Sequence, residues 1–165
     1  MALPNRVLPG FSATLYAQDT ATPTPLTIAE LSTWADVNPI AIEANIIPVE
    51  AIPAFGQDDA MANFNVAGSR QSDKIPTQAP PTSMTITAAW NPADTQLLQM
   101  RDDAYNGTID RTFVIMATDG QGNYVAYAFN GRVGQWDVDT NPTAEAKCSF
   151  TIHPRGNQYG WSNNT

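Results

Sequence analysis

Residues 143–152 alternate between apolar and polar side chains without a break, and this pattern constrains the fold more than any other feature of the chain. Because successive side chains of a strand point to opposite faces, the alternation predicts a strand with one buried face and one face in water. Residues 83–90, which read SMTITAAW, alternate in the same way. Together the two segments predict a sheet that is covered on one side.

Two further elements follow clear local rules. Residues 111–133 form two apolar runs around DGQG, which predicts a hairpin, and apolar residues on both faces of its strands predict a central place in the sheet. Leucines at helical spacing follow Asn91 and Pro92, and Gly107 supplies a stop. We therefore predict the main helix over residues 91–107, with Asn91 as its N-cap.

The first third of the chain is less regular. Residues 12–18 alternate and predict a strand. Thr27 and Glu30 have the spacing of a capping box, which predicts a short helix over residues 27–36. In residues 40–47, one side of an extended chain would carry Ile40, Ile42, Ala44 and Ile46, so we predict another strand there.

Strands outnumber helices in this interpretation, so the predicted fold is mostly β, of the α+β kind. We expect two packed antiparallel sheets that form a sandwich or barrel, flanked by one main α-helix. A chain of 165 residues can bury a sizeable core within one domain. We therefore predict a single domain over residues 1–165.

The charge balance argues against a protein that grips nucleic acid. Eight Lys and Arg against sixteen Asp and Glu give a net charge of −8, whereas nucleic-acid affinity comes mainly from cations that release counterions. The opening MALPNRVLPGF lacks the apolar core of a signal peptide, and YVAYAF, the longest apolar run, is too short to span a membrane. We expect no membrane anchor, and a protein kept in a cytoplasm or released by a route other than secretion.

The chain offers little for catalysis or metal binding. His153, the single histidine, falls on the outward phase of the last strand, and Cys148, the single cysteine, falls on its apolar phase. The two side chains therefore point apart, which argues against a Cys–His pair. Asp137 and Asp139 share a strand face and could start a metal site or line a charged surface; without a second cluster we interpret them as a solvated face. We predict no enzyme and no cofactor.

The tryptophans permit a different class of function, a monomeric carbohydrate-binding β-sandwich with an aromatic platform. Trp34 and Trp90 fall on apolar phases and are predicted to be core residues. Trp136 and Trp161 are then left to face a partner.

The order of short motifs suggests a family. TITAAWNPADTQLLQM is a strand that runs into tryptophan and then into a helix opened by Asn-Pro; AFNGRV ends the hairpin, HPRG closes the last alternating strand, and PNRVLPG forms an opening arm. In this order the chain resembles the tail tube proteins of long, non-contractile-tailed bacteriophages, the siphophages with a lambda-like tube fold. The resemblance covers nearly the whole chain and is strongest over residues 83–156.

The resemblance implies a structural protein whose copies form hexameric rings that stack into the hollow tail tube through which DNA is delivered. The implied partners are copies of the chain itself and the tape measure, tail-tip and terminator proteins, with DNA passing through the lumen without specific binding. The implied location is the virion tail, after synthesis in the cytoplasm of the host bacterium. A tube resembling that of type VI secretion, or a baseplate component, is the alternative within the same fold.

Three surfaces are predicted to carry this assembly. Residues 54–82 contain an irregular stretch with three prolines in residues 65–82, and a loop of this length in a small domain is typical of a binding element. We predict an arm that is mobile in the monomer and ordered against other subunits. The predicted residues are Phe55, Met61, Phe64, Arg70 and Lys74 in this assembly loop; Arg6, Arg155 and Trp161 in terminal arms at residues 1–11 and 154–165; and Asp137, Asp139 and Glu145 in an acidic lumen lining.

Overall fold

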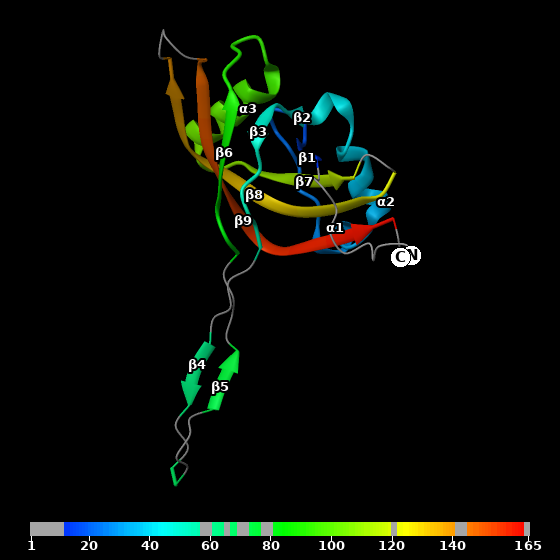
Figure 1. Cartoon of the computed structure of the whole chain (residues 1–165), viewed down its shortest axis with the longest axis vertical. Helices are drawn as coiled ribbons and strands as arrows, with labels where there is room; N and C mark the ends of the chain where they lie inside the picture. The colour runs from blue at the N-terminus through cyan, green and yellow to red at the C-terminus, as the bar shows by residue number, and fades with distance from the viewer. Residues whose placement is uncertain are drawn as a thin grey trace, which may run out of the picture.

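The strands form one seven-stranded antiparallel sheet in the order β2-β1-β7-β8-β9-β6-β3, with a separate β4–β5 pair (Figure 1). This computed structural model describes residues 12–56, 61–64, 67–68, 73–76, 81–119, 122–140 and 145–163. The strands are β1 Ser12–Ala17, β2 Ile46–Ile47, β3 Val49–Ala51, β4 Met61–Phe64, β5 Asp73–Pro76, β6 Met84–Ala89, β7 Asp110–Thr118, β8 Tyr124–Asp139 and β9 Lys147–Ser162. The helices are α1 Ile28–Leu31, α2 Trp34–Val37 and α3 Thr95–Asn106, with 3-10 turns η1 Asn38–Ile40 and η2 Glu43–Asn45.

The prediction of a mostly β fold flanked by one main helix is confirmed, but the two expected sheets are joined into one. β8 and β9 are 16 residues long, and one half of their ladder lies beside β7 while the other half lies beside β6. The ladder shifts register between Ala128 and Asn130 and again between Gly134 and Asp137. Bulges of this kind bend a strand and increase its twist, so the same two strands serve both halves.

The main core lies between the two halves of this bent sheet and α3. Leu15 of β1, Ile86 of β6 and Phe150 of β9 are all fully buried in it, although they come from distant strands. Leu97 and Met100 of α3 pack into the same cluster. The alternation in β6 is as predicted, with Met84, Ile86 and Ala88 buried and the intervening residues more exposed.

α3 begins and ends by standard capping rules. The side chain of Asp94 accepts hydrogen bonds from the backbone N–H groups of Gln96 (2.9 Å) and Leu97 (3.2 Å), so Asp94 is the N-cap. The prediction of Asn91 as the cap is wrong: its side chain accepts from the N–H of Ala93 (3.0 Å) in the preceding turn. Gly107 ends the helix with a φ of 70°, as predicted. No helix in the described ranges is long and apolar enough to cross a membrane.

The second half of β9 corrects the prediction of a C-terminal tail. Residues 154–162 continue the strand and pair with β8, with Tyr127 opposite Gly160 and Ala126 opposite Trp161. The central hairpin of β7 and β8 is confirmed, because both strands have neighbours on either side. β8 continues past a bulge near Gly134, and Gln135 there has a φ of 51°.

A smaller cluster covers the other face of the sheet. Leu31, Val37 and Ile40 come from the helical segment and pack on Val114 and Ala128 of the central strands. The predicted capping box is present, since the N–H of Thr27 donates to the Glu30 carboxylate (2.8 Å). This contact lowers the pKa of Glu30.

The prediction of a strand over residues 40–47 is wrong except for its last two residues, Ile46 and Ile47. The side-chain amide of Asn45 donates to the carbonyl of Ile40 (2.9 Å), which closes a compact turn with η1 and η2. Ile42, which the strand pattern placed on the buried side, is 49% exposed.

A buried ion pair joins α3 to the sheet. Arg111 of β7 is completely buried, and its guanidinium binds both carboxylate oxygens of Asp103 at 2.7 and 2.9 Å. It also donates to the carbonyls of Gln18 and Thr20, after β1, and to the side chain of Gln99. A buried charge is tolerated when its hydrogen bonds are met in this way.

We expect Asp103→Asn to lower the free energy of unfolding by about 3–5 kcal/mol, because Arg111 would remain buried without its counter-charge. Asp102→Asn is the matched control, since Asp102 is exposed and pairs with the partly exposed Arg101. That change should stay within about 0.5 kcal/mol. Urea denaturation followed by circular dichroism measures both, and equal midpoints for the two variants would contradict the role given to Arg111.

Candidate interaction surfaces

The β4–β5 hairpin projects away from the body of the molecule (Figure 1). Its strands pair with each other, Met61 opposite Pro76 and Phe64 opposite Asp73, so the segment that we expected to lack structure contains regular secondary structure. Met61 is 51% exposed, and Lys74 is exposed as well. At its base, the N–H of Thr82 donates to the carbonyl of Gly56 (3.1 Å), which holds the two ends of the excursion together.

The residues predicted for this loop are divided between the hairpin and its base. Phe55 lies at the base, where its ring packs edge-on against Tyr127 at 5.2 Å and is partly buried against the main core. This contact anchors the base of the excursion to the body of its own subunit. Phe64 is the last residue of β4, and Arg70 lies outside the described residues.

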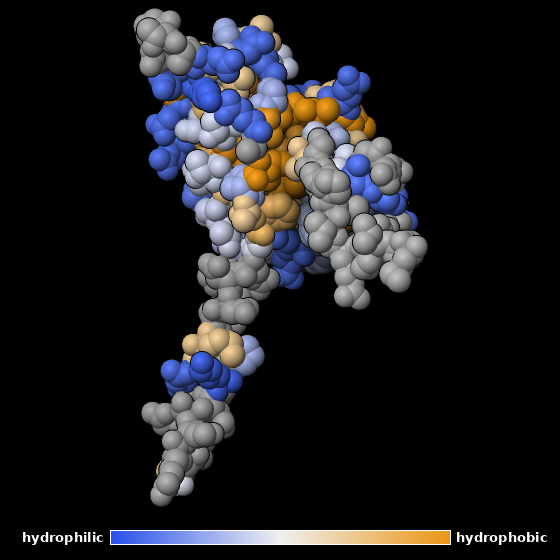
Figure 2. Space-filling view, in the orientation of Figure 1, coloured by the Kyte–Doolittle hydropathy of each residue, from blue (hydrophilic) through white to orange (hydrophobic). Residues whose placement is uncertain are grey.

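Figure 2 shows a contrast between the body and the hairpin. Apolar residues gather on the body beside β2 and β3, where Val49 and Ile52 are partly buried against the main core. The described part of the hairpin is of mixed character and includes strongly polar residues. A two-stranded element of this composition has too little apolar area to be stable alone, so a contact that covers it would stabilise it.

The outward face of β6, β8 and β9 is polar. Thr87, Ser149 and Asp137 lie side by side across the three strands, and the hydroxyls of Thr85 and Thr151 lie 3.4 Å apart one step further along. α3 packs on the opposite, buried side of these strands. This face is therefore available to line a water-filled space.

The three predicted acidic residues gather at one end of that polar face. Asp139 lies opposite Lys147, Asp137 lies opposite Ser149, and Glu145 lies two residues before the start of β9. All three carboxylates are exposed, and Asp137 and Asp139 line a shallow hollow of about 250 Å³. We call Asp137, Asp139 and Glu145 the acidic end.

Lys147 lies opposite Asp139 and interacts with Glu145, but a single cation cannot balance the three carboxylates of the acidic end, and its ion-pair partner is Glu50. Its ammonium lies 3.0 Å from the Glu50 carboxylate, and this ion pair raises the pKa of Lys147.

A second charged group lies further along the same strands, and only its Arg155 was predicted from the sequence as a site residue. The Asp110 carboxylate of β7 binds Arg132 of β8 at 2.9 Å and Arg155 of β9 at 2.6 Å. We call Arg132 and Arg155, with their shared Asp110, the arginine pair. Arg155 was predicted to lie in a terminal arm, but it is part of β9. His153 lies opposite Arg132, and its Nδ1 is 2.9 Å from the Ser83 hydroxyl.

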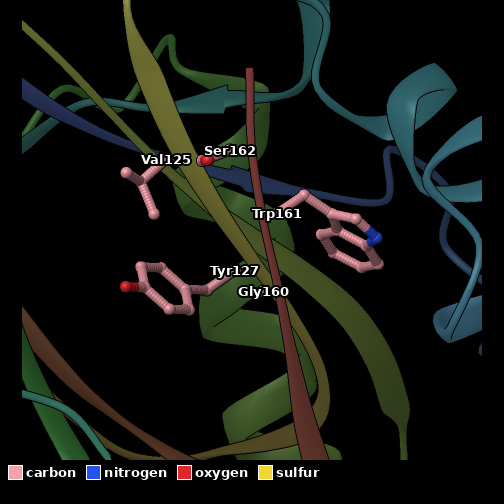
Figure 3. A pocket seen from close by; sticks show the side chains of 5 residues that line it. All are labelled: Val125, Tyr127, Gly160, Trp161 and Ser162. Atoms are coloured by element: carbon pink, nitrogen blue, oxygen red, sulfur yellow. The ribbon is translucent and has the colours of Figure 1, made fainter. Parts of the chain in front are cut away.

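An open hollow of about 480 Å³ lies between the ends of β8 and β9, lined by Val125, Tyr127, Gly160, Trp161 and Ser162 (Figure 3). Val125 and Tyr127 point to one side of the two strands and Trp161 to the other. A side chain at Gly160 would crowd the Tyr127 ring, with a Cβ only 3.1 Å from its nearest atom. The hollow contains no charged side chain and no arrangement for acid–base chemistry.

The tryptophans are used for packing. Trp161 lies 5.4 Å from Trp34 between their ring centres, in the smaller cluster. Trp136 stacks on Phe150 at 6.1 Å and meets Trp90 edge-on at 5.6 Å. Trp136 and Trp161, which we expected to face a partner, thus pack against aromatic rings of their own chain while remaining partly exposed.

Cys148 and His153 lie on opposite faces of β9, as predicted. Cys148 is 1% exposed, its thiol donates toward the carbonyl of Ala88 (3.6 Å), and burial raises the pKa of the thiol. The described residues contain no group of three or more His, Cys, Asp or Glu side chains that could hold a metal ion.

Comparison with known proteins shows similarity of structure only. No protein-family model matches the chain, and no curated protein matches its sequence. A chain from the sheath/tube terminator of PVC, an extracellular contractile injection system, is 11% identical with a TM-score of 0.64, covering 98% of this chain and 97% of that one.

Two other solved structures extend the similarity. A chain from the tube-terminating cap of the anti-feeding prophage is 9% identical, with a TM-score of 0.67 over 98% of this chain and 95% of that one. The SPP1 tail tube is 13% identical, with a TM-score of 0.53 over 93% of this chain and 76% of that one. The resemblance to tail tube proteins is thus confirmed for the fold: the chain has the architecture shared by a phage tail tube and by tube-associated proteins of contractile injection systems.

Proposed function

We propose that this chain is a structural subunit whose copies form rings that stack into the hollow tube of a phage tail or of a phage-tail-like injection apparatus. The observation that carries the proposal is the fold, which is shared over nearly the whole chain with tube, terminator and cap proteins. The subunit acts without catalysis. Its partners are copies of itself, in hexameric rings, and the tape measure, tail-tip and terminator proteins of the virion tail.

The sheet supplies edges for joining copies within a ring. β3 pairs with β6 only at Ala88 and Thr87, so the outer edge of residues 84–86 has no strand partner among the described residues. At the other end of the sheet, β2 covers β1 only at Leu15 and Tyr16. Unpaired edges favour pairing with another chain, and edges at opposite ends of one sheet suit a head-to-tail contact that closes into a ring.

The projecting hairpin supplies the contact to an adjacent copy. An element that stands away from the body, with Met61 half exposed at 51%, is stabilised when a neighbour covers its apolar residues. Phe64, Arg70 and Lys74 are proposed to take part in the same contact. Its ordering on assembly would oppose premature polymerisation of the free subunit.

The polar face of β6, β8 and β9 is proposed to line the lumen, with α3 on the outside of the tube. Between its two charged ends, this face presents the hydroxyl side chains of Thr85, Thr87 and Ser149, which give DNA no cation to bind. Asp137, Asp139 and Glu145 add negative charge, which repels phosphates that approach within a Debye length of about 8 Å. Such a wall would let DNA pass without holding it.

Negative-stain electron microscopy of the purified protein tests the proposal. We expect rings or hollow filaments whose number rises with protein concentration, because edge pairing and stacking both depend on mass action. A dispersed monomer at all concentrations would contradict the proposal, and binding of that monomer to a glycan array would favour the carbohydrate-binding alternative.

Similarity to the terminator, the cap and an anti-feeding prophage baseplate favours a second candidate, a component that binds only the end of a tube. Such a protein would form single rings that bind to tube ends without growing into filaments. The same micrographs separate the two candidates.

We expect replacement of residues 57–81 by a short Gly-Ser turn to abolish filaments while leaving the midpoint of thermal unfolding unchanged. The body should remain intact because Gly56 and Thr82 are already hydrogen-bonded to each other and β4 and β5 form a separate sheet.

A matched pair of point variants narrows the same test. Met61→Ser on the hairpin should weaken assembly, whereas Tyr105→Ser on α3, which is 72% exposed, should leave it unchanged. Filaments of normal length from the shortened chain would contradict the role of the hairpin.

A further inference from the structure

One carboxylate is shared by two guanidinium groups at the arginine pair. Arg132 binds both oxygens of Asp110, at 2.9 and 3.2 Å, and Arg155 binds the second oxygen at 2.6 Å. By contrast, Arg101, Arg111 and Lys147 each have a carboxylate of their own. Two positive charges and one negative charge leave a surplus of +1, and the side chain of Arg155 is 56% exposed. The surplus charge therefore faces the solvent.

The arginine pair and the acidic end lie on the same face of the sheet. They are found toward opposite ends of the segment over which β9 pairs with β6. Residues 147, 149, 151, 153 and 155 share one face because side chains alternate along a strand. Lys147 lies opposite Ala89 at the end of β6, whereas Arg155 lies beyond Ile152, which is opposite Met84 at its start. Eight residues of strand separate Lys147 from Arg155, a distance of about 26 Å.

The two groups lie toward opposite ends of the pairing between β6 and β9. In Figure 1 the end of β8 and the start of β9 lie at the top, and the start of β6 lies at the bottom, where the chain leads to the β4–β5 hairpin.

The two ends of this face have opposite charge. At the acidic end the net charge is −3, from the four carboxylates of Asp137, Asp139, Glu145 and Glu50 and the one ammonium of Lys147. The arginine pair has a net charge of +1. Identical subunits with one negative and one positive end attract each other head to tail and repel each other when like ends meet.

We propose that the arginine pair of one copy receives the acidic end of a second copy in the next ring, so that rings stack in a single direction. This inference rests on the proposed function, because it names the contact between stacked rings. The occupant is a second copy because its acidic end complements the arginine pair in sign and lies on the same face of the strands. A chain with a net charge of −8 repels DNA at long range, so phosphate is the weaker candidate.

Disulfide cross-linking tests the contact directly. In a Cys148→Ala background, we expect Glu145→Cys with Arg155→Cys to form a ladder of linked subunits under mild oxidation. The two positions are ten residues apart on one extended segment, about 33 Å, which exceeds the reach of a disulfide within one subunit. Glu145→Cys with Arg101→Cys is the control, since Arg101 lies on α3, on the other side of the sheet; this pair should remain monomeric on a denaturing gel.

Charge exchange tests the energetics. Arg155→Glu should raise the protein concentration needed for filaments by about tenfold or more, the factor that follows from losing about 1.4 kcal/mol. Arg101→Glu makes the same change in net charge away from the contact and should have no such effect. Adding Glu145→Arg to Arg155→Glu should restore filaments, because opposite charges again meet.

The outcomes separate this inference from the proposed function. The inference would be overturned if the wild-type protein formed filaments, the 145–155 cysteine pair formed no cross-link, and Arg155→Glu left filament formation unchanged. The tube assignment would then still stand. Loss of binding to a fluorescent DNA duplex in Arg155→Glu with unchanged filaments would assign the arginine pair to phosphate and also overturn it. Absence of any wild-type assembly would contradict both proposals.

Discussion

The pairing of β8 with β9 is the constraint on which the rest of the structure depends. These two strands carry both halves of the sheet, and their bulges place β7 beside one half and β6 beside the other. The same ladder decides which side chains enter the core and which face outward. A slip of one residue would exchange the two faces and bury charged residues. The buried row that includes Phe150 and Ile152 specifies the register against such a slip.

The sequence predicted the elements in which burial and local rules agree. Alternation identified β6 and the first half of β9, and two-sided apolar runs identified the central hairpin. It failed where the local signal was weak: residues 154–162 are polar and contain Gly156 and Gly160, yet they are held in the sheet by pairing with β8. Residues 40–47 show the opposite failure, because a side-chain hydrogen bond from Asn45 stabilises a turn that hydrophobic spacing cannot reveal.

The candidate surfaces were predictable to a smaller degree. The acidic residues could be placed on one face because they lie near alternating segments, and the exposed hairpin was recognisable as an excursion without a place in the sheet. The arginine pair could not be predicted, because Asp110, Arg132 and Arg155 come from three different strands. Only the register of strand pairing brings them together. Arg155 was singled out from the sequence without its partners. The type of a residue alone does not show which side chains it will contact in the folded protein.

Arg111 has a consequence for the motions of the subunit. Its guanidinium binds α3 through Asp103 and Gln99 and binds the segment after β1 through two backbone carbonyls, while its own backbone is held in β7. The helix cannot detach without breaking several charge-assisted hydrogen bonds at once. Opening of α3 is thereby coupled to opening of the sheet beside it, and the two behave as one cooperative unit in local unfolding.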